Sequence, residues 1–354
     1  MCTFIVMTSG TGCKLTEGKV NKAKKILKRF GLPQAENVEN ANVVIYFTCQ
    51  FTNQKEGQTI NDVRILSCKG KTVLLSGCLQ KVILDSVKDL KNVIIVQESE
   101  LESYLNKNYD HGINNLITET DCNIITIGDG CYGRCAYCSI PFGRPNNGRY
   151  VAKPIDEIIT EIGEINKNTV YLAALDVSAY NFKEYRLPKL LKRIWEIYPG
   201  IEIQLGNLNI AFVKNWTDAD LEILAHVNGN INLPIQSANN RIIEYMNRFY
   251  TVDDFGRLYK RLTSMGASVI TDMICGYPSE TLEEHKKNCE FFQKFPMPFA
   301  QIFKFDPKRG TPAAESPEQI PLEVQIERTC EVIASYACIN PEGDVNTNLE
   351  LQLL

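Results

Sequence analysis

Short apolar runs alternate with longer helical stretches along almost the whole chain, and this alternation predicts a parallel α/β fold. In the first third of the chain, the apolar runs occupy residues 3–7, 43–47, 72–76 and 93–96. Helical stretches separate these runs, so neighbouring strands can run parallel. We therefore expect residues 1–115 to form a small α/β domain with an open, doubly wound parallel sheet.

The alternation restarts after a polar stretch at residues 108–121, whose composition is typical of a linker. Six further apolar runs lie at about residues 123–128, 169–173, 201–205, 231–235, 268–274 and 299–305. Helical stretches follow these runs, and such βα units predict a partial (β/α)6 barrel over residues 116–338. Residues 339–354 form a polar tail that is too short for another domain.

Composition and charge restrict the classes of function. The chain has 354 residues, 44% of them hydrophobic, which is enough apolar material for two or three cores. It shows neither a membrane-spanning apolar run nor a basic, apolar leader, so the sequence predicts a cytoplasmic protein without a membrane partner. The net charge of -4 excludes a global positive field, although residues 1–115 carry 15 Lys and Arg against 11 Asp and Glu. A nucleic-acid partner would therefore need a local patch.

Three of the 13 cysteines, Cys131, Cys135 and Cys138, lie in the sequence CYGRCAYC, directly after the first expected barrel strand. A loop at the carboxyl end of a barrel strand lies on the face where barrel active sites are built. Three thiolates from one loop can hold three corners of a cubane iron–sulfur cluster and leave its fourth iron open. A closed zinc site would need a fourth protein ligand, and none of the three histidines lies near this loop. The alternative is three unconnected thiols in a surface turn.

A second trio, Cys13, Cys49 and Cys78, follows the first three expected strands of the N-terminal domain, one cysteine after each strand. Because the carboxyl ends of parallel strands meet at one edge of a sheet, we expect these thiols to converge. Glycines just before Cys13 and Cys78 allow the backbone to approach a bulky cluster. Three ligands again imply one open iron. The remaining cysteines have no partner spacing and are predicted to be structural: Cys2, Cys68, Cys122, Cys275, Cys289, Cys330 and Cys338.

The C-x3-C-x2-C spacing, with an aromatic residue before the last cysteine, resembles the radical S-adenosylmethionine (radical SAM) enzymes. In that superfamily the open iron of a [4Fe-4S] cluster binds the amino and carboxylate groups of S-adenosylmethionine, whose one-electron reduction gives a 5′-deoxyadenosyl radical. The resemblance implies that Tyr137, in the aromatic position, lies beside the adenine. Packing over the cluster is the alternative role for this ring.

Two open-site clusters in two domains resemble the arrangement of the methylthiotransferases, and further motifs resemble that family in the same order. They are LPIQSA at residues 233–238, MNRFYT at 246–251, TDMICGYPSET at 271–281 and FDPKRGTPAA at 305–314. Motif detail is nearest to the archaeal and eukaryotic branch, which modifies threonylcarbamoyladenosine beside the tRNA anticodon. The chain ends where members normally carry a small all-β domain called TRAM, so we expect that domain to be lacking.

Four further residues are expected to contact the cofactor. Gln236, Asp272 and Gly276 follow or end the fourth and fifth expected barrel strands, where a barrel presents ligand contacts. Asp176 joins them through the sequence AALDVSAY, which also resembles the archaeal and eukaryotic branch. Helix capping by the polar side chains and a simple turn at the glycine are the alternative roles.

By this resemblance, the protein is a transferase of sulfur-containing groups that converts a C–H bond of a macromolecule to C–S–CH3. The implied cofactors are two [4Fe-4S] clusters and S-adenosylmethionine, with a sulfur ligand on the Cys13/Cys49/Cys78 cluster: sulfide, persulfide or methanethiolate. The implied electron donor is a low-potential protein such as flavodoxin or ferredoxin.

Three hypotheses about the activity stay open at this point. An isoelectric point of 5.6 and the missing TRAM domain favour a peptide or protein side chain, such as that of a ribosomally made precursor peptide. The branch resemblance favours adenosine-37 of tRNA, in its threonylcarbamoyl form. A non-catalytic iron–sulfur electron carrier is the third hypothesis, but its clusters would have four protein ligands each, against three and three here.

Overall fold

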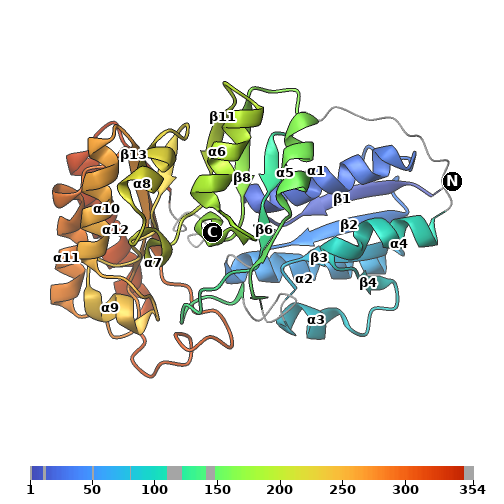
Figure 1. Ribbon diagram of the computed structural model, residues 1–354. Coiled ribbons are helices and arrows are strands. Elements are labelled where there is room, and N and C mark those ends of the chain that lie inside the picture. Colours follow the sequence, from blue (N-terminus) through green and yellow to red (C-terminus); the bar gives the residue numbers. More distant parts are fainter. Residues whose placement is uncertain are drawn as a thin grey trace. The chain divides into compact units, whose positions relative to one another are not determined.

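The structure is a computed structural model that describes residues 2–10, 13–49, 52–79, 81–109, 122–140 and 148–346 (Figure 1). The chain folds into two compact units. The first unit comprises Met1–Thr126, Ser139–Arg149 and Asp156–Ala173, and the second comprises Ile127–Cys138, Tyr150–Ile155 and Ala174–Leu354. Most of the expected linker at 108–121 lies outside the described residues. No helix of the described part is long and apolar enough to span a bilayer.

The first unit contains a four-stranded sheet in which all neighbouring strands run parallel, as predicted. Its strands are β1 (Phe4–Thr8), β2 (Val43–Thr48), β3 (Thr72–Gly77) and β4 (Val93–Ile95), in that order across the sheet. Its helices are α1 (Lys14–Arg29), α2 (Asn53–Cys68), α3 (Lys81–Val87) and α4 (Leu101–Asn108), with the 3-10 turn η1 (Glu98–Glu100) before α4.

Helices cover both faces of this sheet, which confirms the doubly wound class (Figure 1). Side chains of a strand alternate between faces, and those of β2 divide accordingly. Ile45 and Phe47 pack with Leu27 of α1 and Leu105 of α4 in one buried cluster. The other face of the sheet packs against α2 and α3 in a second buried cluster, which includes Val44, Tyr46, Val63 and Ile83.

Next to β1, the direction in which successive chain segments are added across the sheet changes. The backbone N–H of Phe4 donates to the carbonyl of Pro33 at 2.8 Å, and the N–H of Ala35 donates to the carbonyl of Phe4 at 2.7 Å. Phe4 pairs with Val43 on its opposite side, so the chain first passes along the outer edge of β1 and then crosses to β2. The topological switch point therefore lies between β1 and β2, and open α/β sheets bind ligands beyond the carboxyl ends of their strands at this point.

The first unit also holds the parallel pair β5 (Ile124–Thr126) and β8 (Thr169–Ala173), together with nearly all of α5 (Ile155–Gly163). Helix α1 packs closely against β5. An added Cβ on Gly18 would lie 3.0 Å from Cγ2 of Ile124, so this glycine permits the close contact. Nδ2 of Asn21 also hydrogen-bonds Sγ of Cys122 at 3.1 Å, just before the strand.

The second unit contains the other four expected barrel strands. They are β11 (Glu202–Leu205), β12 (Asn230–Asn232), β13 (Ser268–Cys275) and β14 (Phe299–Lys304), and β15 (Asp344–Asn346) from the tail pairs parallel to β14. Short antiparallel pairs are formed by β6 (Gly128–Asp129) with β7 (Val151–Ala152) and by β9 (Asn181–Phe182) with β10 (Tyr185–Arg186). The helices are α6 (Leu187–Ile197), α7 (Ile210–Val213), α8 (Asp218–Ala225), α9 (Asn240–Tyr245), α10 (Val252–Ser264), α11 (Leu282–Lys294) and α12 (Leu322–Ile339), with the 3-10 turn η4 (Val177–Ala179).

Local sequence explains where three of these helices begin. Thr217, Thr251 and Thr281 are the N-caps of α8, α10 and α11, and each accepts a hydrogen bond from the third helical residue, whose acidic side chain accepts one in return. This capping box satisfies backbone donors that a helix otherwise leaves open. The loop before each of these helices is thereby fixed in position.

Candidate functional site

The structure places Cys13, Cys49 and Cys78 at the carboxyl ends of β1, β2 and β3, as predicted from the sequence. Cys13 is the N-cap residue of α1, and Cys49 directly follows β2 and is 8% exposed. Cys78 directly follows β3. Because the switch point lies between β1 and β2, Cys13 and Cys49 flank the crevice where such sheets bind ligands.

Hydrogen bonds connect the three strand ends to one another. Oγ of Ser9, at the end of β1, accepts a hydrogen bond from the backbone N–H of Cys49 at 3.1 Å. Oγ1 of Thr48 donates to the carbonyl of Cys78 at 2.6 Å. Gly77 has a positive φ of 94°, and an added Cβ would lie 2.9 Å from both N and O of Thr48. Glycine is therefore required at this position, and it lets Cys78 approach the end of β2.

A tyrosine from β8 lies near the first trio. Burial raises the pKa of Tyr171, and the Cys13 thiol adds to this effect. Tyr171 is more than 150 residues away from Cys13 in sequence, so no local pattern indicated this neighbour. Only the folded unit brings the two side chains together.

The second trio lies on the loop that follows β6. The backbone N–H of Gly133 donates to Sγ of Cys131 at 3.2 Å. An added Cβ on Gly133 would lie 3.2 Å from Sγ of Cys131 and 3.6 Å from Sγ of Cys135, so a side chain there would enter the space between the two sulfurs. The loop is anchored by the backbone N–H of Ala136, which donates to the carbonyl of Met246 at 2.9 Å.

Arg248 connects this loop to the segment after β12, where cofactor contacts are expected. Its Nη1 donates to Sγ of Cys135 at 3.3 Å, and its Nε donates to the hydroxyl of Tyr250 at 3.1 Å. The Tyr250 hydroxyl in turn donates to the carbonyls of Pro234 and Ile235 at 2.9 and 3.0 Å. Arg248 therefore places a positive charge and a hydrogen-bond donor beside the Cys135 sulfur.

Asp176 lies beside the same loop and is almost fully buried, at 3% exposure. Its Oδ1 accepts a hydrogen bond from the Ser178 hydroxyl, whereas its Oδ2 has no partner among the described residues. Burial raises the pKa of Asp176. Burial, with a further contribution from the Asp176 carboxylate, also raises the pKa of the Cys131 thiol to about 11. A cation bound at this thiol would stabilise its thiolate.

Asp272 lies within β13, not at its end as the sequence predicts, and it is next to Gln236, which follows β12. The backbone N–H of Gln236 donates to the carbonyl of Asp272 at 2.8 Å. Oδ1 of Asp272 accepts hydrogen bonds from Asn232 and Gln301 at 3.0 and 2.7 Å. Burial is the main cause that raises the pKa of Asp272 to about 6. Neither side chain is the N-cap of α9 or α11, the helices that follow, and their contact with a cofactor stays a prediction.

Tyr137 and Gly276 make contacts that also fit a packing role. The Tyr137 ring meets the Tyr277 ring edge to face at 6.4 Å and packs on a buried cluster that includes Met246 and Phe305. An added Cβ on Gly276 would lie 2.7 Å from Cγ of Gln325 in α12. Gly276 therefore permits close packing of α12 in this unit.

The donors of both trios are compatible with iron–sulfur clusters. Among the residues that the structure describes, neither trio gathers its sulfurs around the position of a single ion, as a closed zinc site would require. In a cubane cluster each thiolate binds a different iron, so the ligands stand farther apart. Oδ2 of Asp176, which has no partner among the described residues, adds a polar acceptor beside Cys131 of the second trio. The residues of the second trio and their surroundings therefore fit a bound cluster.

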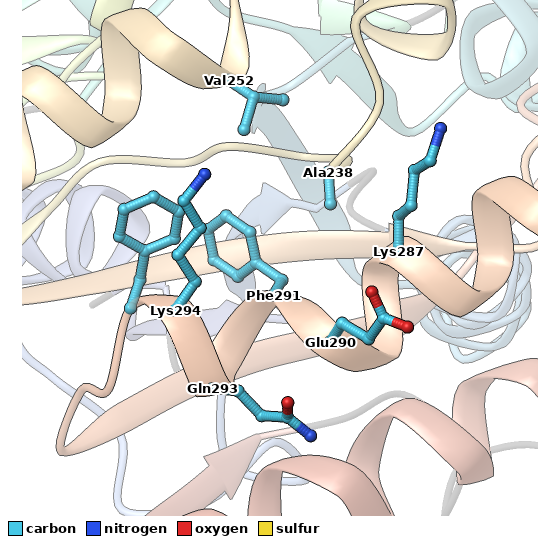
Figure 2. A pocket seen from close by; sticks show the side chains of 8 residues that line it. Ala238, Val252, Lys287, Glu290, Phe291, Gln293 and Lys294 are labelled. Carbon is cyan, nitrogen blue, oxygen red and sulfur yellow. The ribbon is translucent and has the colours of Figure 1, made fainter.

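Figure 2 shows a pocket of the second unit that does not involve the trios. It is lined by Ala238, Val252, Lys287, Glu290, Phe291, Gln293, Lys294 and Phe295. None of the predicted site residues lines it, and it adds no residue to the candidate site.

Two family profiles match the chain in the order expected from the two cysteine trios. The profile described as "Uncharacterized protein family UPF0004" matches residues 5–97, which include Cys13, Cys49 and Cys78. The profile described as "Radical SAM superfamily" matches residues 125–292, which include Cys131, Cys135 and Cys138.

Curated relatives that span both parts agree on one family. A threonylcarbamoyladenosine tRNA methylthiotransferase from Mus musculus is 27% identical over 89% of this chain, and a probable one from Methanocaldococcus jannaschii is 27% identical over 92%. The ribosomal protein uS12 methylthiotransferase RimO from Desulforamulus reducens is 28% identical over 86%. The chain belongs to the radical SAM methylthiotransferase family. It spans 59% of the mouse relative's length, 81% of the archaeal and 76% of the bacterial one.

Solved radical SAM enzymes share the fold of this family member. The radical SAM methyltransferase TsrM from Kitasatospora setae, with cobalamin and a [4Fe-4S] cluster bound, matches with a TM-score of 0.57 and 12% identity over 85% of this chain and 74% of its own. The cobalamin-dependent radical SAM enzyme OxsB matches with a TM-score of 0.57 and 11% identity over 97% of this chain and 57% of its own. At this identity the match concerns the fold alone, and it confirms the predicted fold class.

Membership in the radical SAM family implies S-adenosylmethionine and an iron–sulfur cluster as cofactors. The second trio carries the spacing that this superfamily uses, and the structure gives that trio a cationic donor and a buried carboxylate nearby. The names of the relatives include both tRNA and ribosomal protein substrates, and tRNA is the more frequent of the two. They support tRNA, the alternative drawn from the sequence, better than the peptide that the low isoelectric point favoured.

Proposed function

We propose that this protein is a tRNA methylthiotransferase that converts a C–H bond of an adenosine to C–S–CH3. The observation that carries the proposal is the order of two cysteine trios along the chain. The first follows the parallel strands β1, β2 and β3, and the second lies on the loop after β6, in a chain whose relatives include enzymes named for tRNA substrates. The substrate is threonylcarbamoyladenosine of tRNA, the nucleoside that the names of these relatives give, and the family resemblance of the sequence motifs implies position 37.

Each trio has its own role in the proposed reaction. Cys131, Cys135 and Cys138 hold a [4Fe-4S] cluster that, with S-adenosylmethionine bound, supplies hydrogen-atom abstraction by a radical. This cluster of the second trio is called the second cluster. The first trio, Cys13, Cys49 and Cys78, holds the first cluster and thereby positions the sulfur to be transferred. The strand ends that carry this trio are fixed by the hydrogen bonds of Ser9 and Thr48, so the thiols keep one spacing.

Residues of the second unit shape the surroundings of the radical chemistry. Arg248 keeps a positive charge against Sγ of Cys135, and Asp176 presents a buried carboxylate oxygen beside Cys131. We assign the Asp176 carboxylate and the backbone around Gln236 and Asp272 to S-adenosylmethionine, whose ammonium group needs acceptors. The burial of these residues excludes water, which would otherwise compete for these polar groups.

Exposed aromatic side chains beside the second trio support a nucleobase as the target. Tyr132 directly follows Cys131 and is 50% exposed, and its ring lies 5.8 Å from that of Tyr150 and 6.1 Å from that of Phe212. Proteins recognise unpaired bases of RNA by stacking them on such rings. A Tyr132→Ala substitution should therefore weaken tRNA binding while the iron content stays unchanged.

The test compares three proteins after anaerobic reconstitution with iron and sulfide: the wild type, a Cys13→Ala/Cys49→Ala/Cys78→Ala variant and a Cys131→Ala/Cys135→Ala/Cys138→Ala variant. The exposed Cys68→Ala variant is the matched control. Each is incubated with S-adenosylmethionine, a reductant and tRNA that carries threonylcarbamoyladenosine, and digested nucleosides are analysed by mass spectrometry. We expect about eight irons in the wild type and about four in each triple variant.

The products separate the two roles. We expect the methylthio derivative of threonylcarbamoyladenosine only with the wild type and the control, and 5′-deoxyadenosine also with the variant that lacks the first trio. Four irons in both the wild type and that variant would contradict the two-cluster proposal. Unmodified tRNA, with 5′-deoxyadenosine formed, would contradict the RNA substrate.

A second candidate substrate is a protein side chain, which the likeness to the ribosomal protein uS12 methylthiotransferase favours. A parallel incubation with ribosomal protein uS12 tests it. A methylthio group on the protein but not on tRNA would replace the proposal by this candidate. Salt also distinguishes the two, because tRNA binding should weaken steeply as salt rises.

A further inference from the structure

The last two helices of the second unit bring three metal-binding side chains together, apart from the cysteine trios. His285 and Cys289 lie one turn apart on α11, and Glu331 lies on α12, which packs against α11. Nε2 of His285 lies 2.5 Å from Oε2 of Glu331 and 3.6 Å from Sγ of Cys289. All three ligand atoms lie within 4.8 Å of one another. No other such group is found among the described residues.

Nε2 of His285 cannot serve both of its neighbours by hydrogen bonding at the same time. A neutral imidazole nitrogen carries either one hydrogen or one lone pair. When Nε2 donates to the Glu331 carboxylate, it offers no lone pair to the Cys289 thiol, whose other hydrogen-bond partner is the Ser335 hydroxyl. When Nε2 accepts from the thiol, its lone pair opposes a carboxylate oxygen 2.5 Å away. A cation placed among the three atoms would accept an electron pair from each of them at the same time.

The surroundings favour a cation and allow it to enter. His285 is 1% exposed, whereas the Glu331 side chain is 54% exposed, so the group opens to solvent on one side. The Ser335 hydroxyl hydrogen-bonds the Cys289 sulfur and orients it. Glu280 and Glu290 lie near enough to Cys289 to add negative potential, although Glu280 is paired with Arg328.

We propose that His285, Cys289 and Glu331 form a Zn²⁺ site that connects α11 to α12. One thiolate, one imidazole and one carboxylate are a ligand set of mixed softness that suits Zn²⁺. The open side at Glu331 leaves room for water as a fourth ligand. The ion is separate from the iron–sulfur clusters, because the six cysteines of the trios take no part in it. Its role is to fix the final helix of the unit, which Gly276 contacts through Gln325.

The metal content of the cluster-loaded protein tests the site. The wild type, Cys289→Ser and Glu331→Gln are produced with zinc in the medium, purified anaerobically with their clusters intact, and analysed for zinc and iron by mass spectrometry. Cys330→Ser is the matched control, because Cys330 is an exposed cysteine next to Glu331. We expect one zinc per chain in the wild type and control, and at least a tenfold loss in Cys289→Ser, with iron unchanged in all four proteins.

X-ray absorption at the zinc edge identifies the ligands. We expect one sulfur at about 2.3 Å together with nitrogen and oxygen at about 2.0–2.2 Å. Three sulfurs would mean zinc in a cysteine trio and would overturn the proposal, as would a wild type without zinc or equal zinc in Cys289→Ser and the control. If Cys289→Ser does not fold, Glu331→Gln carries the test, since its side chain is half exposed, and unchanged zinc in that variant overturns the proposal.

Discussion

Both cysteine trios supply three thiols, but different features of the fold determine the spacing of those thiols. Cys131, Cys135 and Cys138 stand on one short loop, so eight consecutive residues determine their spacing. Cys13, Cys49 and Cys78 stand at three strand ends, so their spacing depends on the register of β1, β2 and β3. Local geometry sets the spacing of the loop trio, whereas the spacing of the strand-end trio exists only when the sheet is folded. We therefore predict that a substitution can damage the loop trio without destabilising the fold. At the strand-end trio, the same kind of substitution should damage the site and the fold together.

The largest difference in stability is expected between substitutions of the two glycines that stand beside the trios. Gly77→Ala forces a side chain into a positive φ and against the Thr48 backbone, so we expect the free energy of unfolding to fall by about 3 kcal/mol. Gly133→Ala only presses on the sulfurs of Cys131 and Cys135, so we expect iron loss with little change in stability. Urea unfolding and iron content of both variants check this. Equal destabilisation by the two substitutions would remove the contrast between the trios.

A smaller effect is expected from the serine that supports each trio. Ser9→Ala removes the acceptor of the Cys49 N–H, which should cost about 1 kcal/mol. Ser178→Ala removes the donor to the buried Asp176 carboxylate, which should cost about 2 kcal/mol because the acceptor is ionisable. Denaturant unfolding measures both, with the exposed Ser103→Ala as control. If Ser9→Ala costs nothing, the bridge between β1 and β2 does not stabilise the first trio.

The free energy of unfolding should depend on pH because the pKa of Asp272 is raised in the folded protein. Its pKa of about 6 in the folded protein lies above the ordinary value of 3.8, so the folded state binds the proton more tightly than the unfolded chain. Stability should therefore fall as the pH rises through this interval, by about 1 kcal/mol between pH 5 and 7. Asp272→Asn should remove this dependence. Denaturant unfolding of both proteins at several pH values checks the sign, and parallel curves would contradict the raised pKa.

The smallest effect is expected from the cation beside Cys135. Arg248→Lys keeps the charge but cannot donate to both Cys135 and Tyr250 from a planar group. Hydrogen bonds to cluster sulfurs raise the reduction potential, so we expect the potential of the second cluster to become more negative by tens of millivolts. A redox titration followed by electron paramagnetic resonance measures the shift. The first cluster should titrate as in the wild type.

The pattern of apolar runs was sufficient to predict the positions of the strands, because buried parallel strands consist of consecutive apolar residues. All ten predicted strands form within a few residues of their expected positions, and the polar tail adds β15, which its composition did not indicate. The chain segment at Pro33–Ala35, which passes along the outer edge of β1, also carried no strand signal. Such edge contacts depend on tertiary pairing and leave no period in the sequence.

The cysteines of the candidate site stand out in the sequence because the chemistry depends on one residue type at one spacing, and their role as cluster ligands stays a prediction. Tyr171 and Ser9 could not be connected to these cysteines from the sequence, because long-range packing brings them there. Cys289 illustrates the same limit. Its spacing to other cysteines predicts a structural role. His285 lies one turn away on the same helix, but Glu331 comes next to them only when α12 packs against α11.

The inclusion of β5 and β8 in the first unit has a consequence for the order of synthesis. The three cysteines at the strand ends are all translated by residue 78, yet Tyr171 and the strand that carries it follow more than 90 residues later. On the ribosome, the sheet would therefore present its thiols before the segments that pack beside Cys13 have emerged. An iron donor that acts during translation would reach this trio before the strand that carries Tyr171 packs beside Cys13.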